Sequence, residues 1–119
     1  MHSGHEKTLK VLTCDETLGF FLNGPDKWNE LVEQFDEIHF DFSNVDWNSY
    51  KILLQKLNGR RQLPNELVSF KDYKFKSGVL NFSGAKFELL SLDISDIDLG
   101  NTTLRLDDIL LYGATINLS

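Results

Sequence analysis

Cys14, His39 and Asp41 are the residues of this chain whose types could support nucleophilic catalysis. Such a set needs a thiol, a base that takes its proton and a carboxylate that orients the base. His39 and Asp41 alternate along one strand pattern, so they share a face. No recognisable nucleophile motif surrounds Cys14, and a single cysteine usually serves as a small core residue. We therefore predict no catalytic residue and expect a protein that is not an enzyme.

Aspartates and histidines are the other residues that could do chemistry, as metal ligands. The C-terminal half carries Asp93, Asp96, Asp98, Asp107 and Asp108, and the N-terminal tail carries His2 and His5. A calcium loop alternates oxygen ligands around a glycine at fixed spacing, and no such loop is present. Two histidines in a polar tail are too few ligands for a structural metal site. We expect no metal and no cofactor, and we interpret the aspartates as a solvated acidic face.

Charge and composition restrict the partners and the compartment. The formal net charge is −6, which disfavours direct nucleic-acid binding because phosphate contacts need basic surface. Lys71, Lys74 and Lys76 do alternate with aromatic residues, but those aromatics are needed for a core, so we interpret the lysines as a solvated edge. No apolar run approaches the ~20 residues of a membrane span. The single cysteine fits a reducing compartment, and we expect a cytoplasmic protein without a membrane partner.

Residues 1–66 have the pattern of an α/β portion, closed by a polar loop at 60–66. In the run IHFDF, Ile38, Phe40 and Phe42 alternate with polar residues, which predicts a strand with one buried face. Apolar residues at i, i+3, i+4 and i+7 twice predict an amphipathic helix. The expected elements are strands at 8–13, 18–22 and 38–42, and helices near 26–35 and 48–57.

Residues 67–119 show a five-residue beat that fits neither a helix nor a flat strand. Phe82, Phe87, Leu92 and Ile97 are five positions apart. With two-residue insertions, the beat extends to Phe70, Phe75, Leu104, Ile109 and Ile116. Such a period is typical of a chain that turns corners and stacks its turns. We expect one α+β domain over residues 1–119, with two amphipathic helices in the N-terminal half and a short right-handed β-solenoid-like stack of strands in the C-terminal half.

The C-terminal half resembles the pentapeptide-repeat family. That family has an apolar central residue, a small residue two positions earlier and often Asn or Asp directly before the centre. Ala85, Ser95, Thr102 and Ala114 match the small position, and Asn81, Asp96 and Asp108 match the amide or acidic position. Tyr73, Leu80, Leu90 and Asp107 depart from the small position. The resemblance implies a four-sided β-helix; an irregular parallel β-helix and an antiparallel meander are the alternatives.

Two further five-residue units can be read at 38–42 and 43–47, which would make residues 48–66 a helical insertion in the same stack. The segment EIHFDFSNVD, followed by a helix, also resembles STAS-like regulatory domains. In those domains an aspartate-bearing strand end precedes a conformational or phospho-switch. Trp47 and Asn48 replace the small loop residues of that family. This second resemblance implies a switch near Ser43.

We expect the protein to function by binding another molecule. We predict a non-enzymatic protein–protein interaction or regulatory module, with an acidic DNA mimic, as the pentapeptide-repeat resemblance implies, and a STAS-like switch as alternatives. Because Ala114 to Leu118 are followed by no capping helix, we expect the C-terminal end to be covered by a second copy in a homodimer. The residues predicted to bind a partner are Asp93, Asp96, Asp98, Ile116 and Leu118.

Overall fold

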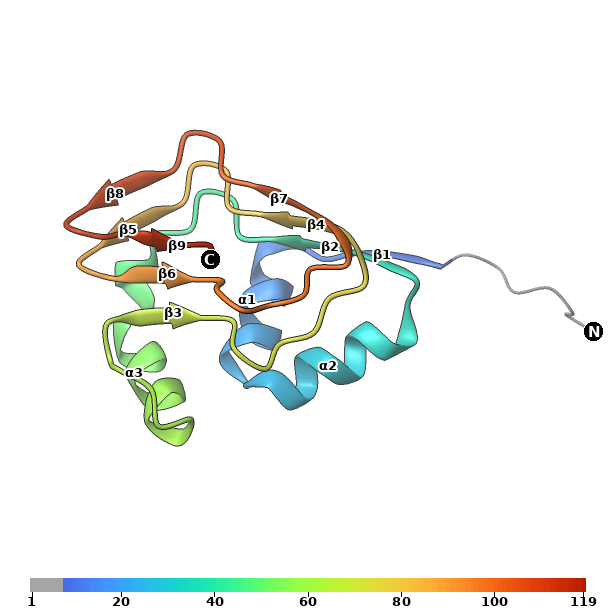
Figure 1. Ribbon diagram of the computed structural model, residues 1–119, viewed down its shortest axis with the longest axis horizontal. Helices are drawn as coiled ribbons and strands as arrows, with labels where there is room; N and C mark the ends of the chain where they lie inside the picture. Colours follow the sequence, from blue (N-terminus) through green and yellow to red (C-terminus); the bar gives the residue numbers. More distant parts are fainter. Residues whose placement is uncertain (1–7) are drawn as a thin grey trace, which may run out of the picture.

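Parallel strands from successive turns of the chain lie side by side in a stack, with helices at one end of it (Figure 1). The computed structural model describes residues 8–119, so His2 and His5 lie outside the described residues. The helices are α1 (Cys14–Leu22), α2 (Pro25–Gln34) and α3 (Lys51–Arg60), and a 3-10 turn, η1 (Trp47–Tyr50), directly precedes α3. This combination of helices and strands agrees with the expected α+β class.

The strands form three sheets, and each strand pairing among the described residues is parallel. One sheet has the order β1 (Leu9–Val11), β2 (Glu37–Asp41), β4 (Ser77–Asn81) and β7 (Asn101–Arg105). The second has the order β3 (Leu67–Ser69), β6 (Ser91–Asp93) and β9 (Ile116–Asn117), and the third joins β5 (Lys86–Glu88) to β8 (Leu110–Tyr112). Parallel pairing excludes the antiparallel meander for the C-terminal half.

One register recurs in all three sheets. Ser77 pairs with Asn101, Leu67 with Ser91, and Lys86 with Leu110, so paired residues are 24 positions apart. The pairing of β2 with β4 spans 40 positions instead. The additional residues contain η1 and α3, which are therefore an insertion into the first turn of the stack. Their place corresponds to the insertion predicted at 48–66.

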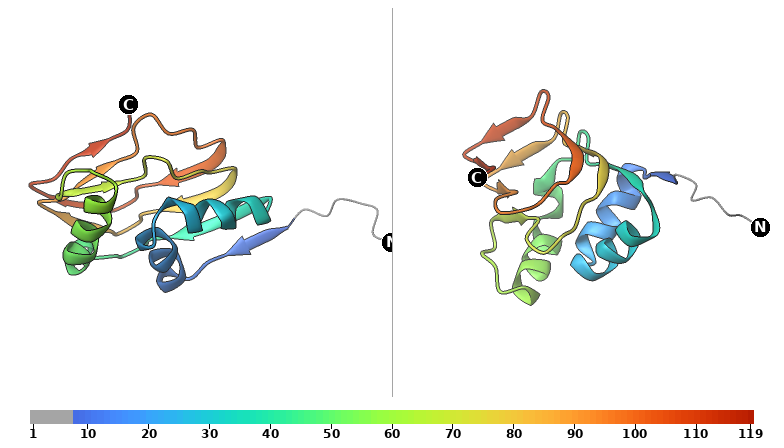
Figure 2. Two further views of the ribbon diagram at one scale, coloured as in Figure 1. Left: turned by 90° about the horizontal axis from the view of Figure 1, so that it is seen from below. Right: turned by 45° about the vertical axis from the view of Figure 1, so that its right-hand side comes forward.

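Helices α1 and α2 lie at one end of the stack (Figure 2), and their buried aromatic side chains pack against its first turn. The ring of Trp28 in α2 stacks on Phe40 with centroids 4.0 Å apart, and the ring of Phe21 in α1 lies 4.7 Å from that of Phe70. Tyr73 donates a hydrogen bond from its hydroxyl to the Phe21 carbonyl at 2.7 Å. Each buried aromatic side chain removes roughly 150–250 Å² from water, so these contacts dominate the attachment of the helices.

Inside the stack, equivalent residues of successive turns lie on one another. The rings of Phe42 and Phe82 stack at 5.1 Å, and those of Trp47 and Phe87 stack at 5.8 Å. In the next turn, Leu111 pairs in register with Phe87. The five-residue beat thus marks inward side chains on either side of corners, but the repeat that the fold uses is longer.

The corners are made by residues that tolerate a left-handed backbone. At one corner Asn44, Gly84 and Asp108 have φ values of 59°, 70° and 55°. Asparagine, aspartate and glycine adopt this conformation more readily than other residues. Directly before this corner, the Asn81 side chain accepts a hydrogen bond from the Ser83 N–H at 2.8 Å, as the Asp41 side chain does from Ser43 one turn earlier.

A repeat of 12 residues, half of one turn, is the sequence signature of this geometry. Its first apolar position recurs at Leu80, Leu92, Leu104 and Ile116. An amide or carboxylate follows it at Asn81, Asp93 and Asn117, and a second inward residue follows that one at Phe82, Ile94 and Leu118. Two steps of five leave two residues over in a repeat of 12, which explains why the five-residue beat needs two-residue insertions outside the run from Phe82 to Ile97.

The strand predicted at 18–22 is wrong, because these residues belong to helix α1. The Thr13 hydroxyl caps the helix by accepting a hydrogen bond from the Glu16 N–H, and the Glu16 carboxylate accepts one from the Thr13 N–H. This capping box satisfies two backbone donors and favours a helix start at Cys14. The structure therefore has a third helix in the N-terminal half, where two were expected.

The other two helices occupy the predicted regions with small shifts. The helix expected near 26–35 is α2, and the one expected near 48–57 begins as the 3-10 turn η1 and continues to Arg60. Leu54 and Leu57 are buried as their spacing indicated, whereas Leu53, assigned to the same stripe, is 47% exposed.

Candidate functional site

His39 and Asp41, two of the three residues considered for catalysis, each have another local partner. His39 Nε2 lies 3.1 Å from Glu37 Oε2 on the same strand. The Asp41 carboxylate accepts a hydrogen bond from the Ser43 N–H at 2.8 Å and so holds a turn. Burial raises the pKa of the Cys14 thiol, and the charge of Asp41 raises it further. Within residues 8–119, no hydrogen bond joins any two of Cys14, His39 and Asp41.

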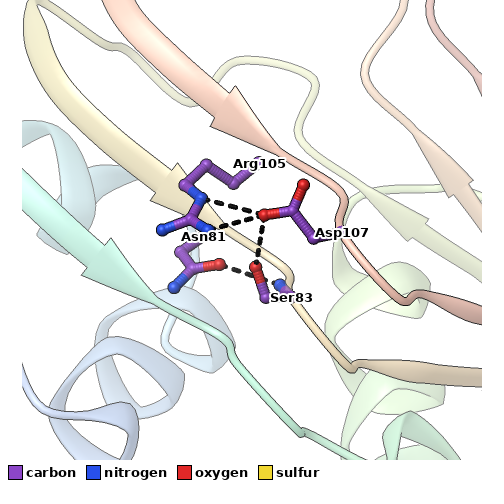
Figure 3. Close-up of polar contacts among 4 residues, drawn as sticks. All are labelled: Asn81, Ser83, Arg105 and Asp107. Carbon is purple, nitrogen blue, oxygen red and sulfur yellow. Dashed lines mark hydrogen bonds and ion pairs between the residues drawn. The ribbon is translucent and has the colours of Figure 1, made fainter.

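A polar cluster links two successive turns near the ends of β4 and β7 (Figure 3). Arg105 donates from Nη2 and Nε to Asp107 Oδ2 at 2.6 and 3.1 Å. Ser83 donates from its hydroxyl to the same oxygen at 3.4 Å, and its N–H is held by Asn81. Hydrogen bonding and the positive charge of Arg105 lower the pKa of Asp107. These contacts occupy Arg105, which is the only Lys or Arg among residues 99–119.

The predicted partner-binding aspartates lie at the end of β6 (Asp93) and in the segment that joins β6 to β7 (Asp96 and Asp98). Asp93 accepts hydrogen bonds from the N–H and the hydroxyl of Ser95 at 2.9 and 2.5 Å, so its side chain shapes the turn. Asp96 occupies a left-handed corner with φ of 58°. The Asp98 carboxylate accepts a bond from the Gly100 N–H at 2.9 Å. All three residues thus belong to turns, through the side chain at Asp93 and Asp98 and through the backbone at Asp96. Of the three, only Asp96 and Asp98 are exposed.

Asp96 and Asp98 also line an open groove of about 460 Å³ against α2. Glu33 borders this groove from α2, while Lys74 and Lys76 border it from the preceding turn. The groove therefore carries charges of both signs. Among residues 8–119, no group of three or more metal-ligating side chains comes together, in this groove or elsewhere.

The predicted residues Ile116 and Leu118 lie in a different place, the final turn, which we define as residues 99–119. Here inward-facing positions that are covered in earlier turns become accessible. Phe70 is fully buried, Ile94 is 4% exposed, and Leu118, the equivalent residue in the final turn, is 55% exposed. The same change separates Phe87 (0%) from Leu111 (40%). No described residue lies over this end of the stack.

Strand edges surround this accessible apolar end. β7, β8 and β9 are each the last strand of their sheet, so in the described part of the chain their outer edges have no strand partner. Residues 109–119 contain no charged side chain, and Arg105, Asp107 and Asp108 are the only charges of the final turn. Exposed strand edges normally carry charges that block pairing with another chain. The final turn lacks this protection along β8 and β9.

Comparison with protein-family models, with curated proteins and with solved structures gives no match to this chain. The resemblances to pentapeptide repeats and to STAS-like domains therefore stay predictions. No helix among the described residues is long and apolar enough to cross a membrane.

Sequence reasoning selected Ile116 and Leu118 but missed the rest of the apolar end. Leu110, Leu111 and Tyr112 are 44%, 40% and 51% exposed. The absence of charge over residues 109–119 was a visible signal, because it contrasts with the lysines and aspartates of every earlier turn.

Proposed function

We propose that the chain is a non-enzymatic interaction module that binds another polypeptide through the final turn. One observation carries this proposal: β7, β8 and β9 end their sheets together, around inward apolar residues that stay accessible. Pairing with unpaired strand edges is a common mode of peptide recognition, in which backbone hydrogen bonds provide affinity. Covering residues such as Leu111 and Leu118 adds about 25 cal/mol for each Å² of apolar area removed from water.

Photocrosslinking in the native cells tests the proposal. The photoreactive residue p-benzoylphenylalanine replaces Tyr112, which is 51% exposed in β8, and crosslinked peptides are identified by mass spectrometry. We expect efficient crosslinks to a defined polypeptide. Ile52, which is 69% exposed on α3 at the other end of the stack, is the matched control position. Equal crosslinking from positions 112 and 52 would contradict the proposal.

The DNA-mimic alternative stays a prediction with less support from the contacts. Its residues Asp96 and Asp98 share their groove with Lys74 and Lys76, whereas a mimic needs an uninterrupted row of negative charge. Its test is competition with DNA for a DNA-binding partner, abolished by the combined change Asp93→Asn, Asp96→Asn and Asp98→Asn. The STAS-like switch near Ser43 also stays a prediction, and phosphorylation at Ser43 would be its signature.

A further inference from the structure

We infer that the polypeptide bound by the final turn is a second copy of this chain, related by a twofold axis, with strands antiparallel across the junction. This inference rests on the proposed function and specifies its partner.

The shape of the accessible apolar end of the final turn restricts which polypeptide can cover it. Three strand edges from three sheets surround one apolar interior, so a single added strand would leave two edges and most of the interior uncovered. A complete cover must present three edges with the same outline. The final turn of a second copy has the same outline, because it is the same surface. Such a contact is isologous, which means that both subunits use the same patch.

The opposite end disfavours a head-to-tail arrangement, because among the described residues it offers one open strand edge, that of β1, and not three. There, α1 and α2 bring Phe21 and Trp28 against the first turn, as Figures 1 and 2 show for the helices. A third copy could not stack on that end without displacing these buried rings. Association through the final turn therefore closes at two copies and does not continue as a fibre.

A twofold axis perpendicular to the stack reverses the strand direction of the second copy. Strand pairs across the junction are then antiparallel, unlike the parallel pairs within the chain. One of the three edge strands would pair with the same strand of the second copy. Each of the other two would pair with the second copy's version of the other. This exchange places the apolar residues of the two final turns face to face.

The charges of the final turn permit contact between identical surfaces. The whole chain carries a net charge of −6, so most of its surface would repel a copy of itself. Residues 109–119 carry no charge, and Arg105 is paired with Asp107 at the corner of β7. The final turn therefore carries little net charge that would oppose contact with a second copy.

The test is the mass of the purified full chain by light scattering after gel filtration, at about 100 µM, since interfaces of standard size range from µM to pM affinity. We expect twice the mass of one chain. The variant Leu111→Lys with Leu118→Lys should elute with the mass of one chain, because it places charge on the apolar end. The matched control, Ile52→Lys with Leu53→Lys, removes two exposed aliphatic residues on α3 and should stay dimeric.

A wild-type mass of one chain at this concentration would overturn the inference, and this measurement does not depend on any variant folding. A dimer that persists in the folded Leu111→Lys, Leu118→Lys variant, with folding checked by circular dichroism, would also overturn it. Crosslinks from position 112 to another protein, together with a monomeric mass, would leave the proposed function standing and remove only the second copy. No crosslinks and a monomeric mass would remove both.

Discussion

Cys14 is the residue through which the expectation of no catalysis can be tested most directly. Burial, then the charge of Asp41, then that of Asp15 raise its thiol pKa above the ordinary value of 9.0. We expect alkylation by iodoacetamide near pH 8 to be slower in the folded chain than in the urea-unfolded chain, because the thiolate is the reactive form. The variant Asp41→Asn should react faster than the wild type, and Asp26→Asn on α2 is the control.

The raised pKa of the Cys14 thiol also makes the free energy of unfolding depend on pH. The folded chain holds the Cys14 proton to a higher pH than the unfolded chain does. The contribution of this thiol to the free energy of unfolding is therefore fully present below the unfolded pKa and is lost as the pH rises through the folded pKa. A Cys14 that reacts faster folded than unfolded would contradict both statements and would reopen the catalytic interpretation.

At the scale of the elements, close strand contact depends on Gly78 in β4. It has φ of 123°, and a Cβ at this position would lie 2.0 Å from the Ile38 carbonyl oxygen of the paired strand β2. We expect Gly78→Ala to lower the free energy of unfolding by at least about 1–3 kcal/mol, the usual cost of a strained backbone, plus the cost of separating β2 from β4. Urea unfolding measures this difference.

Gly59 in α3 provides the matched control for this change. A Cβ there meets no atom within 4 Å, and the residue is helical. Gly59→Ala should therefore raise the free energy of unfolding by about 0.5–1 kcal/mol through helix propensity. If both glycine variants shifted stability in the same direction, the strand contact at Gly78 would not be the constraint described.

Residue patterns predicted some elements well and missed others for physical reasons. The alternation of Ile38, Phe40 and Phe42 and the stripes of α2 and α3 depend on local geometry, so the sequence shows them directly. The run at Leu18–Leu22 was too short to separate strand from helix by period, and the capping box of Thr13 and Glu16 was the signal that decided it.

The candidate site was predictable only in part. Ile116 and Leu118 follow the inward positions of the repeat, so their types indicated an apolar end. The 24-residue register is a pairing between distant segments, and sequence spacing shows it only after the 12-residue repeat is recognised. Leu111 is exposed because no further turn among the described residues covers it. A local sequence pattern does not contain this information.

At the scale of the whole molecule, burial falls along the stack from the helices to the final turn. We expect this gradient to appear as a gradient of local stability in hydrogen exchange. In the Leu111→Lys, Leu118→Lys variant, the amides of Ile116 and Asn117 in β9 should exchange at least about 100-fold faster than those of Ile38 and Phe40 in β2. Strand β2 lies between β1 and β4, whereas β9 is the last strand of its sheet.

In the wild type, protection of the same β9 amides should increase with protein concentration, because a second copy would cover them. Protection in β2 should stay constant over that range and serves as the internal reference. Equal protection of β2 and β9 in the variant would contradict the gradient.

The shared register of 24 residues also limits how this chain can change its length. Deleting or duplicating 24 residues within β4 to β9 would bring each corner glycine, asparagine or aspartate over its equivalent in the turn below, as Gly84 and Asp108 are now. A change of any other size would move inward side chains to the surface, unless it fell at a corner and formed its own packed element. The segment with η1 and α3 is such an addition. Insertions of any length are therefore tolerated at the corners, whereas the strands accept only insertions or deletions of whole turns.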